Sequence, residues 1–265
     1  MQPSQSQKGA DFRALHEGEA FIIPNPWDAG SAKVLEALGF KALATTSSGF
    51  AFTLGRLDGA ATLDDVIDHV RLLDRSTALP VSVDLENGYG PDPETAASAV
   101  VAAAGAGAVG GSIEDYDPEG GLYSFDHAVE RVAAASEAAE RLSFPFMLTA
   151  RAENHIRGNP DLDDTIARLQ AFERAGADVL YAPGLRNAAE IRAVCEATSK
   201  PVNVLAHAGL TMSEIAEAGA RRVSVGGALA WASVAALAAA AEKMRDDGDF
   251  SLLAGSARIG EWLGD

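Results

Sequence analysis

The stretch AGAVGGSIED, residues 106–115, carries the pattern that decides the fold. An Ala-rich segment ends at Gly107, a short apolar run follows over residues 109–114, and that run closes on the carboxylate of Glu114. Glycine supplies the left-handed residue that ends many helices. A short apolar run after such a turn is typical of a buried strand. The stretch therefore predicts a helix, a tight turn and a strand that ends in an acid.

The same helix-to-strand turn recurs along the chain, because a glycine or a proline stands before most of the other apolar runs. These residues are Gly39, Pro80, Pro145, Gly176, Pro201 and Gly219. Proline is tolerated at the first residue of a strand. The runs themselves predict strands over residues 21–25, 42–46, 81–84, 109–114, 146–150, 179–182, 202–205 and 222–225.

Eight apolar strands that alternate with amphipathic helices predict a parallel sheet covered on both sides. A chain of 265 residues suits an α/β fold of the closed (β/α)8 TIM-barrel type. We expect one domain over residues 1–265, with extra helices at the N- and C-terminal ends. An open doubly wound sheet is the alternative.

The composition excludes several classes of partner. The 21 basic and 38 acidic residues give a net charge of −17, which repels phosphate backbones and makes nucleic acid an unsuitable partner. The one cysteine, Cys195, has no internal disulfide partner and is expected to be a buried thiol. The uncharged window 223–241 is split by Gly226 and Gly227, so we expect no membrane span. The N-terminus also has no signal-peptide core, which predicts a cytoplasmic protein.

The predicted strand ends carry the candidate chemistry, because a barrel builds its active site at the carboxyl ends of its strands. Asp84, Glu86 and Glu114 follow strands three and four, which are neighbours in a barrel. Residues two apart in an extended chain share a face, so Asp84 and Glu86 are expected to point the same way. Three converging carboxylates repel one another unless a hard cation binds them, which predicts Mg²⁺, or Mn²⁺, at this site.

Arg151 directly follows the strand predicted over residues 146–150 and is expected to point into the same mouth. A guanidinium there suits a carboxylate or a developing enolate oxygen. None of the lysines lies at a strand's carboxyl end: they are Lys8, Lys33, Lys41, Lys200 and Lys243. A Schiff-base mechanism needs a lysine in the mouth, so the sequence favours metal-stabilised chemistry instead.

Five segments, taken in order, resemble a known superfamily: WDAGSAKVLEALGFKALATTSSGFA, LGRLD, VDLENGYG, GGSIEDYD and TARAEN. Over nearly its whole length the chain resembles the isocitrate lyase/phosphoenolpyruvate mutase superfamily. Members of that superfamily are magnesium-dependent barrels that make or break C–C or C–P bonds next to a 2-oxo or enolate carboxylate. The resemblance implies that Asp84, Glu86 and Glu114 hold the magnesium, partly through water.

The resemblance also implies roles for the neighbouring loops. Asp58 is expected near the metal, and Arg151 is expected to stabilise the enolate oxygen. The turn of Thr46, Ser47 and Ser48, which Gly49 completes, is expected to bind the substrate carboxylate.

The chain departs from the superfamily pattern in two places. The long lyases carry a Lys-Cys-Gly loop after strand four, whereas this chain has DYDPEGGLYS over residues 115–124. Strand seven reads NVLAHAG where the tricarboxylate lyases have Asn-x-Thr-Glu, which predicts a smaller acid substrate. The candidate proton donors near the mouth are Tyr116, Tyr123 and His207. A tyrosine with an ordinary pKa near 10 is a weak acid, which favours decarboxylation over tricarboxylate cleavage.

Three functions remain open from the sequence. The first is a magnesium-dependent lyase or decarboxylase for a small 2-oxo acid such as oxaloacetate, or for a 2-hydroxy dicarboxylate. The second is a hydrolase or mutase of a phosphonopyruvate-like C–P bond, and the third is a barrel that binds a 2-oxo acid without turnover. We also expect a homo-oligomer, a dimer or tetramer, because the helix over residues 228–244 is apolar around most of its circumference.

Overall fold

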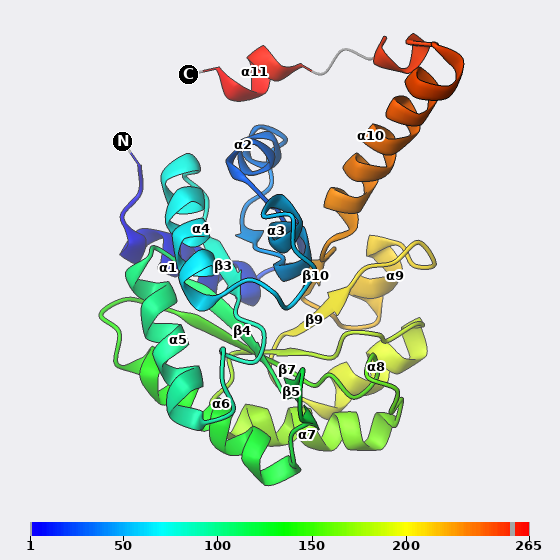
Figure 1. Cartoon of the computed structure of the whole chain (residues 1–265). Helices are drawn as coiled ribbons and strands as arrows, with labels where there is room; N and C mark the ends of the chain where they lie inside the picture. Colours follow the sequence, from blue (N-terminus) through cyan, green and yellow to red (C-terminus); the bar gives the residue numbers. More distant parts are fainter. Residues whose placement is uncertain (1, 255–257, 265) are drawn as a thin grey trace.

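The computed structural model describes residues 2–254 and 258–264, and eight of its strands form one parallel sheet. The strands follow one another around the sheet in chain order: β1 (Phe21–Ile23), β2 (Leu43–Ala44), β3 (Val81–Asp84), β4 (Gly110–Glu114), β7 (Met147–Arg151), β8 (Val179–Tyr181), β9 (Val202–Leu205) and β10 (Arg222–Ser224). β10 pairs with β1, and the Ala44 amide donates to the Pro24 carbonyl at 3.1 Å beside the remaining gap. The sheet is therefore a nearly closed barrel, and the TIM-barrel prediction is confirmed (Figure 1).

Helices surround this sheet and also precede and follow it, as predicted. They are α1 (Gln5–Glu17), α2 (Ala29–Ala37), α3 (Ser47–Thr53), α4 (Leu63–Ser76), α5 (Pro93–Gly105), α6 (Phe125–Glu140), α7 (Leu162–Arg174), α8 (Ala188–Ala197), α9 (Met212–Glu217), α10 (Ala228–Asp247), the 3-10 turn η1 (Ser251–Leu253) and α11 (Ile259–Leu263). Side-chain oxygens of Asp28, Thr62 and Thr211 cap α2, α4 and α9. Each accepts a hydrogen bond from a backbone amide that the first helical turn leaves without a partner.

Two glycines show why the helix-to-strand turns need this residue. Gly107 and Gly176 have φ angles of +116° and +102°, which disfavour residues that carry a Cβ. A Cβ on Gly176 would lie 2.2 Å from Ser136 Oγ, so the turn also packs tightly against α6. These turns set the point at which each strand begins, and hence the level at which its carboxyl end reaches the barrel mouth.

The amino end of the barrel is closed by α1. Phe12 on this helix is fully buried and packs with Ile23, Val109, Met147 and Val179, which belong to or adjoin four different strands. The opposite, carboxyl end carries the longer loops. One of these, between β4 and α6, forms a two-stranded ribbon of β5 (Tyr116–Asp117) and β6 (Gly121–Leu122).

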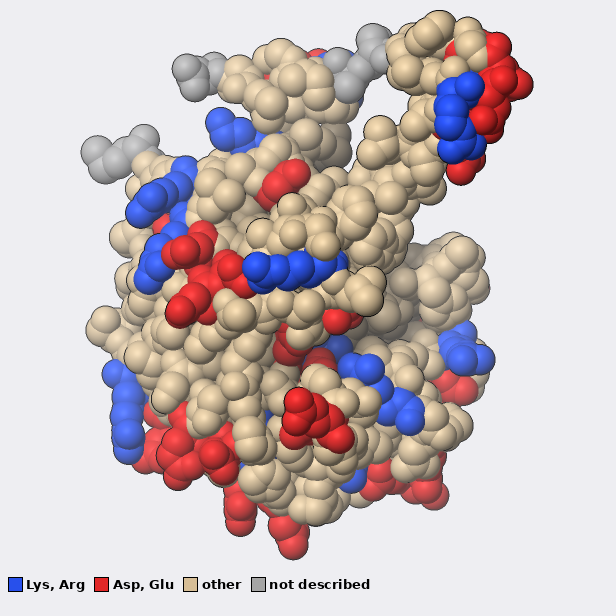
Figure 2. Space-filling view, viewed as in Figure 1, with Lys and Arg blue, Asp and Glu red and all other residues tan. Residues whose placement is uncertain are grey.

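The helix α10 leaves the body of the barrel. Ala230 is its one fully buried residue among those described, whereas Trp231 is 44% and Leu237 is 66% exposed. Figure 2 shows its stem without charged side chains and its outer end with several. At the end of the chain, α11 lies beside α2. None of the described helices is both long enough and apolar enough to cross a membrane.

A second copy of the chain is expected to cover α10, because a water-exposed apolar helix loses the free energy of apolar burial. We predict that light scattering will find a dimer or tetramer at micromolar concentration. Leu237→Asp should shift this protein toward monomer, whereas Glu242→Gln at the charged end of α10 should not. A parent protein that is monomeric under these conditions would contradict the prediction.

The buried side chain of His69 makes the stability of the fold depend on pH. It is 4% exposed on α4, and its ring stacks on Phe50 of α3 with a centroid distance of 4.1 Å. Burial lowers the pKa of His69 to about 4, against an opposing effect of Asp28. Its Nε2 has no hydrogen-bond partner among the described residues. The folded protein therefore keeps this ring neutral at a pH where the unfolded chain protonates it.

Acidification should destabilise the protein through this histidine. Between pH 7.5 and pH 5 the unfolded chain takes up a proton near pH 6.5, whereas the folded chain does so only near pH 4. The resulting loss in the free energy of unfolding is about 2 kcal/mol. Urea unfolding at the two pH values measures this loss. In His69→Phe the free energy of unfolding should fall by about 2 kcal/mol less than in the parent protein. His207→Gln, at an exposed histidine, is the control and should lose as much free energy of unfolding as the parent. An equal loss in the parent and in His69→Phe would contradict the prediction.

Candidate functional site

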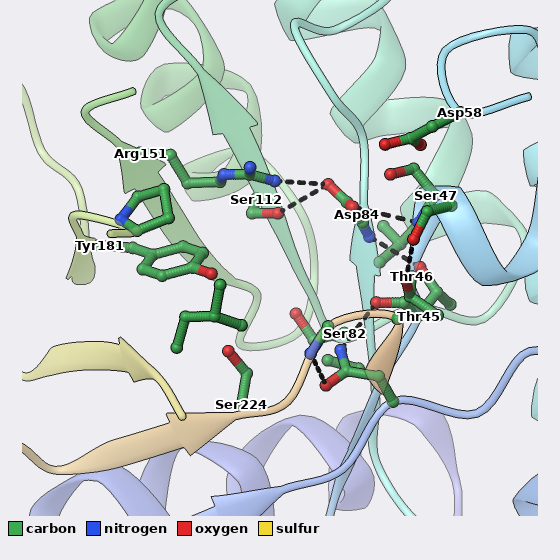
Figure 3. Close-up of a pocket in the computed structure, with 18 of the residues that line it drawn as sticks. Thr45, Thr46, Ser47, Asp58, Ser82, Asp84, Ser112, Arg151, Tyr181 and Ser224 are labelled. Atoms are coloured by element: carbon green, nitrogen blue, oxygen red, sulfur yellow. Dashed lines mark hydrogen bonds and ion pairs between the residues drawn. The ribbon is translucent and has the colours of Figure 1, made fainter. Parts of the chain in front are cut away.

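A cavity of about 220 Å³ opens at the carboxyl ends of the strands. One wall of the cavity carries acidic and hydroxyl side chains, and residues of β8 and β10 form the other wall (Figure 3). The residues that line it are Asn25, Ala44, Thr45, Thr46, Ser47, Ser48, Asp58, Ser82, Val83, Asp84, Ser112, Arg151, Ile156, Tyr181, Pro183, Leu205, Ser224, Gly226 and Gly227. The cavity thus lies at the end of the barrel where the sequence predicts a site.

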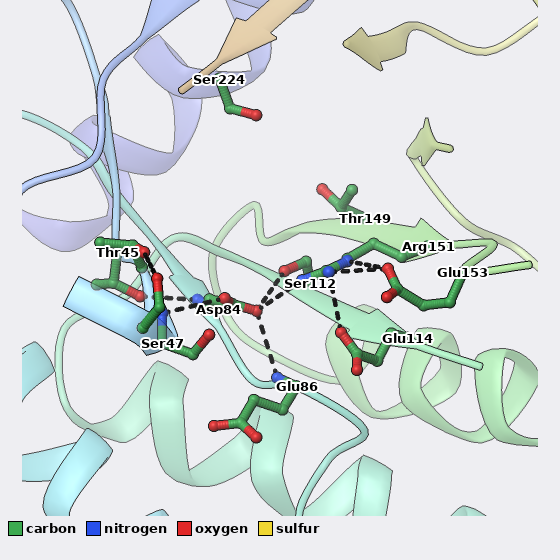
Figure 4. A network of polar contacts seen from close by, with 12 residues as sticks. Thr45, Ser47, Asp84, Glu86, Ser112, Glu114, Thr149, Arg151, Glu153 and Ser224 are labelled. Carbon is green, nitrogen blue, oxygen red and sulfur yellow. Dashed lines mark hydrogen bonds and ion pairs between the residues drawn. The ribbon is translucent and has the colours of Figure 1, made fainter. Parts of the chain in front are cut away.

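Arg151 forms the centre of the polar network. Its Nη1 lies 3.0 Å from Asp84 Oδ1, and its Nη2 lies 3.0 Å from Glu114 Oε2 and 2.8 Å from Glu153 Oε1 (Figure 4). Burial alone would lower the pKa of Arg151, but the three carboxylates outweigh it and raise the pKa well above its ordinary value. The guanidinium is therefore a permanent cation held in one orientation at the cavity wall.

Asp84 ties three neighbouring strand ends together. Its Oδ2 accepts from the Ser47 amide at 3.2 Å and its Oδ1 accepts from Ser112 Oγ at 3.4 Å. Its own amide donates to Thr45 Oγ1 at 2.8 Å. The carboxylate of Asp84 thus faces the cavity between β2, β3 and β4.

The carboxylates of the other two predicted metal ligands contact other groups. Glu86 has a φ of +49°, so the chain is not extended there, and its Oε1 accepts from the Tyr89 hydroxyl at 3.5 Å. The expectation that Asp84 and Glu86 share one face is therefore wrong, and Glu86 points away from Arg151 (Figure 4). Glu114 is held by Arg151 and also by Arg157, at 3.4 Å. Among the described residues, no three acidic, histidine or cysteine side chains form a ready-made metal cluster.

Both outlying carboxyls bind protons more tightly than usual. Burial, with the charges of Asp84 and Asp58, raises the pKa of Glu86 to about 7. Burial also raises the pKa of Glu114 to about 8, where Glu153 and Asp84 add to the effect and Arg151 opposes it. Burial is the main cause of both shifts, and the neighbouring acidic groups add to it.

The N-cap and the first turn of α3 carry the predicted hydroxyl groups. Thr46 Oγ1 and Ser48 Oγ lie 3.2 Å apart, and Thr46, Ser47 and Ser48 all line the cavity. Asp58 reaches the same cavity from an exposed loop. Gly49 lies behind the turn, outside the cavity lining, where a Cβ would stand 2.7 Å from Thr46 Cγ2. Its part in the turn is to allow this close packing.

The predicted proton donors are not at the cavity. The Tyr123 hydroxyl accepts from Asn87 Nδ2 at 3.1 Å, and the guanidinium of Arg131 covers its ring at 4.4 Å. His207 is exposed, and its Nδ1 accepts from the Gly209 amide at 3.0 Å. The ring of Tyr116 packs under a different arginine, on the ribbon. The structure therefore gives Tyr123 and His207 no contact with the cavity.

The strand-end reading reaches Asn25, whereas Tyr181 and Ser224 are among the cavity residues that it does not single out. Asn25 Oδ1 accepts from the amides of Val225 and Gly226, which joins the ends of β1 and β10. Tyr181 ends β8 with its ring 5.2 Å from the Arg151 guanidinium. Its place at a strand end was a signal that could have identified it.

The lone thiol lies elsewhere. Cys195 belongs to α8, beside Gly219, and is half-buried. Burial raises its pKa to about 11, so it carries little thiolate at neutral pH. This agrees with the expected structural role.

Comparisons with known proteins identify the class. The family model described as phosphoenolpyruvate phosphomutase matches residues 12–245. A crystal structure from Burkholderia cenocepacia J2315, provisionally described as a lyase/mutase, has 51% identity and a TM-score of 0.95, and the match covers 98% of this chain and 97% of that one. The oxaloacetate decarboxylase of a Bradyrhizobium species is 32% identical over 226 residues, or 81% of this chain and 76% of that protein. The 2-methylisocitrate lyase of Halalkalibacterium halodurans is 30% identical over 207 residues, which are 76% of this chain and 68% of that protein.

The fold is a TIM barrel with an acidic, arginine-centred mouth, and the matched family and relatives are enzymes of the lyase and mutase class. The chain belongs to the phosphoenolpyruvate phosphomutase family, in the phosphoenolpyruvate mutase/isocitrate lyase superfamily that its motifs resemble. The resemblance stated from the sequence is therefore confirmed.

Proposed function

We propose that this protein is a Mg²⁺-dependent lyase or decarboxylase for a small 2-oxo acid, such as oxaloacetate, or for a 2-hydroxy dicarboxylate. The observation that carries the proposal is the Arg151 guanidinium, fixed by three carboxylates at the wall of a 220 Å³ cavity. A cavity of this size suits a small acid. The similarity to an oxaloacetate decarboxylase over most of both chains supports the same substrate class.

The residues present fit a magnesium ion. The carboxylates of Asp84, Glu86, Glu114 and Asp58 supply oxygen atoms, which are the ligands that Mg²⁺ prefers. Burial is the first cause of the raised pKa values of Glu86 and Glu114, and the neighbouring acidic groups that add to it supply negative charge that a divalent cation would balance. Asp84 would hold the ion, and Glu86, Glu114 and Asp58 would support it, partly through water. When bound, the ion would polarise the 2-oxygen and a carboxylate oxygen of the substrate.

Residues of the chain itself would bind the substrate and stabilise the charge that develops on it. The hydroxyls of Thr46, Ser47 and Ser48 would bind the substrate carboxylate. Arg151 would hold the oxygen that becomes negative as the bond at C3 breaks and an enolate forms. Because the carboxylates already orient the guanidinium, this stabilisation would need little rearrangement during the reaction.

A second candidate is cleavage or rearrangement of a phosphonopyruvate-like C–P bond. The family model that matches residues 12–245 favours it, since that model is described by this type of reaction. Both reactions would pass through an enolate at the same place, so the products distinguish them.

The test is turnover of a substrate panel with and without Mg²⁺. We predict pyruvate from oxaloacetate at about 1 s⁻¹ or faster, and negligible cleavage of isocitrate or 2-methylisocitrate. Arg151→Lys should lower kcat/KM by about 10²- to 10³-fold, because a lysine cannot reproduce the fixed fork of donors. Ser213→Ala on the exposed start of α9 is a control that should leave kcat/KM unchanged.

Other products would change the assignment. Phosphate released from phosphonopyruvate, with no pyruvate from oxaloacetate, would establish the second candidate. Binding of oxalate in the presence of Mg²⁺ with no turnover of any substrate would show a binding barrel and contradict the proposal.

A further inference from the structure

The buried guanidinium of Arg131 binds one of the loops at the barrel mouth. Arg131 lies on α6 and is 1% exposed. Its Nη1 and Nη2 reach four backbone carbonyls of the loop between β3 and α5, which are those of Asn87, Gly90, Pro91 and Asp92. The bonds from Nη1 to the Gly90 and Asp92 carbonyls are 2.8 Å and 3.2 Å long. One side chain thus holds this loop at four points.

The loop that Arg131 binds has a backbone conformation that its own residues disfavour. Glu86 and Tyr89 have φ angles of +49° and +64°, in the left-handed region where a residue with a Cβ is strained. Strained backbone of this kind persists only where the surrounding structure holds it. The bonds from Arg131 supply this restraint, because their acceptors lie within residues 87–92, on both sides of Tyr89.

The left-handed conformation at Glu86 determines where its carboxylate points. The main chain of Glu86 is bound on both sides, since its amide donates to Asp84 Oδ1 at 3.4 Å and its carbonyl accepts from the Glu114 amide at 2.8 Å. Its side chain reaches the loop of Asp58, where Glu86 Oε2 lies 3.8 Å from the place that a Cβ on Gly59 would take. A relaxed φ at Glu86 would rotate the carboxylate away from Asp58.

Tyr123 packs on the same guanidinium and reinforces this arrangement. The Arg131 Cζ lies 4.4 Å from the centroid of the Tyr123 ring. The Tyr123 hydroxyl accepts from Asn87 Nδ2 at 3.1 Å, and Asn87 Oδ1 accepts from the Tyr89 amide at 3.0 Å. Arg131 and Tyr123 both lie outside the cavity lining. Any effect of Arg131 on the cavity must therefore pass through the loop that it holds.

We propose that Arg131 is a positioning residue for Glu86, because its hydrogen bonds hold the loop between β3 and α5 in the conformation that directs the Glu86 carboxylate toward Asp58 and the metal. The inference rests on the proposed function, in which Glu86 supports a Mg²⁺ ion that Asp84 holds. It gives metal binding a determinant on α6, outside the strand ends. Residues that orient the ligands of a metal commonly affect its affinity almost as strongly as the ligands do.

Titration of the full-length protein with Mn²⁺ tests the proposal without turnover, since electron paramagnetic resonance measures the free ion. Arg131→Met keeps the length of the side chain but removes its donors. The Mn²⁺ dissociation constant should rise about 10- to 100-fold, which is the range for the loss of a residue that orients a metal ligand. Arg131→Lys, which keeps the charge and some donors, should lose less affinity than Arg131→Met. An unchanged dissociation constant in Arg131→Met would overturn the proposal.

Lys8→Met is the matched control, because Lys8 is another buried cation that binds the backbone. It is 2% exposed on α1, and its Nζ donates to the Thr77 carbonyl at 3.1 Å and to Asp74 Oδ1 at 2.8 Å. Lys8→Met should lower the melting temperature and leave the Mn²⁺ dissociation constant within twofold of the parent value. If both variants lose Mn²⁺ affinity in proportion to their loss in melting temperature, Arg131 serves only the fold and the proposal is wrong.

A double-mutant cycle with Glu86→Ala tests whether Arg131 acts through Glu86. Asp84 remains to hold the ion, but the carboxylate that Arg131 positions is gone, so Arg131→Met should now change the Mn²⁺ dissociation constant less than twofold. Arg131→Lys takes its place in the cycle if Arg131→Met does not fold. An equal loss of affinity with and without Glu86 would refute the inference and leave the proposed function standing. A parent protein that binds no Mn²⁺ would refute both.

Discussion

The ion pairs of one partly buried arginine hold the candidate site together. Asp84, Glu114 and Glu153 come from the ends of β3 and β4 and from the segment after β7, and each lies within about 3 Å of the Arg151 guanidinium. Without a cation among them these carboxylates would repel one another and separate the strand ends. Breaking a buried ion pair by removing one partner costs far more than losing an exposed one. The arrangement therefore fixes both the shape of the cavity and the orientation of its cation.

Most of the fold followed from local sequence patterns. The apolar runs, most of them preceded by a glycine or a proline, predicted all eight barrel strands to within a few residues. The ribbon within residues 115–124 was expected only as a loop, because its strands are two residues long and carry no alternating pattern. The sequence also did not predict that α10 leaves the barrel. An apolar helix indicates burial, but its apolar residues do not show whether the covering surface belongs to the same chain or to a second copy.

The candidate site was predictable where chemistry coincides with a strand end. Asp84, Arg151 and the turn of Thr46 to Ser48 were found in this way. Glu86 was misplaced because a left-handed residue reverses the direction of a side chain, and nothing in VDLENGYG signals that conformation at a glutamate. Arg131 lies on a helix, where its long-range partners cannot be identified from spacing. Tyr123 and His207 were chosen for proximity in sequence, and tertiary contacts hold them elsewhere.

The central claim is that Arg151 and Asp84 form one site for a metal-bound 2-oxo acid. A crystal structure with Mn²⁺ and oxalate, with the metal located by its anomalous scattering, tests it most directly. The account predicts a manganese peak beside the Asp84 carboxylate and an oxalate oxygen within hydrogen-bond distance of the Arg151 guanidinium. A manganese peak away from Asp84, or oxalate bound without contact to Arg151, would contradict it.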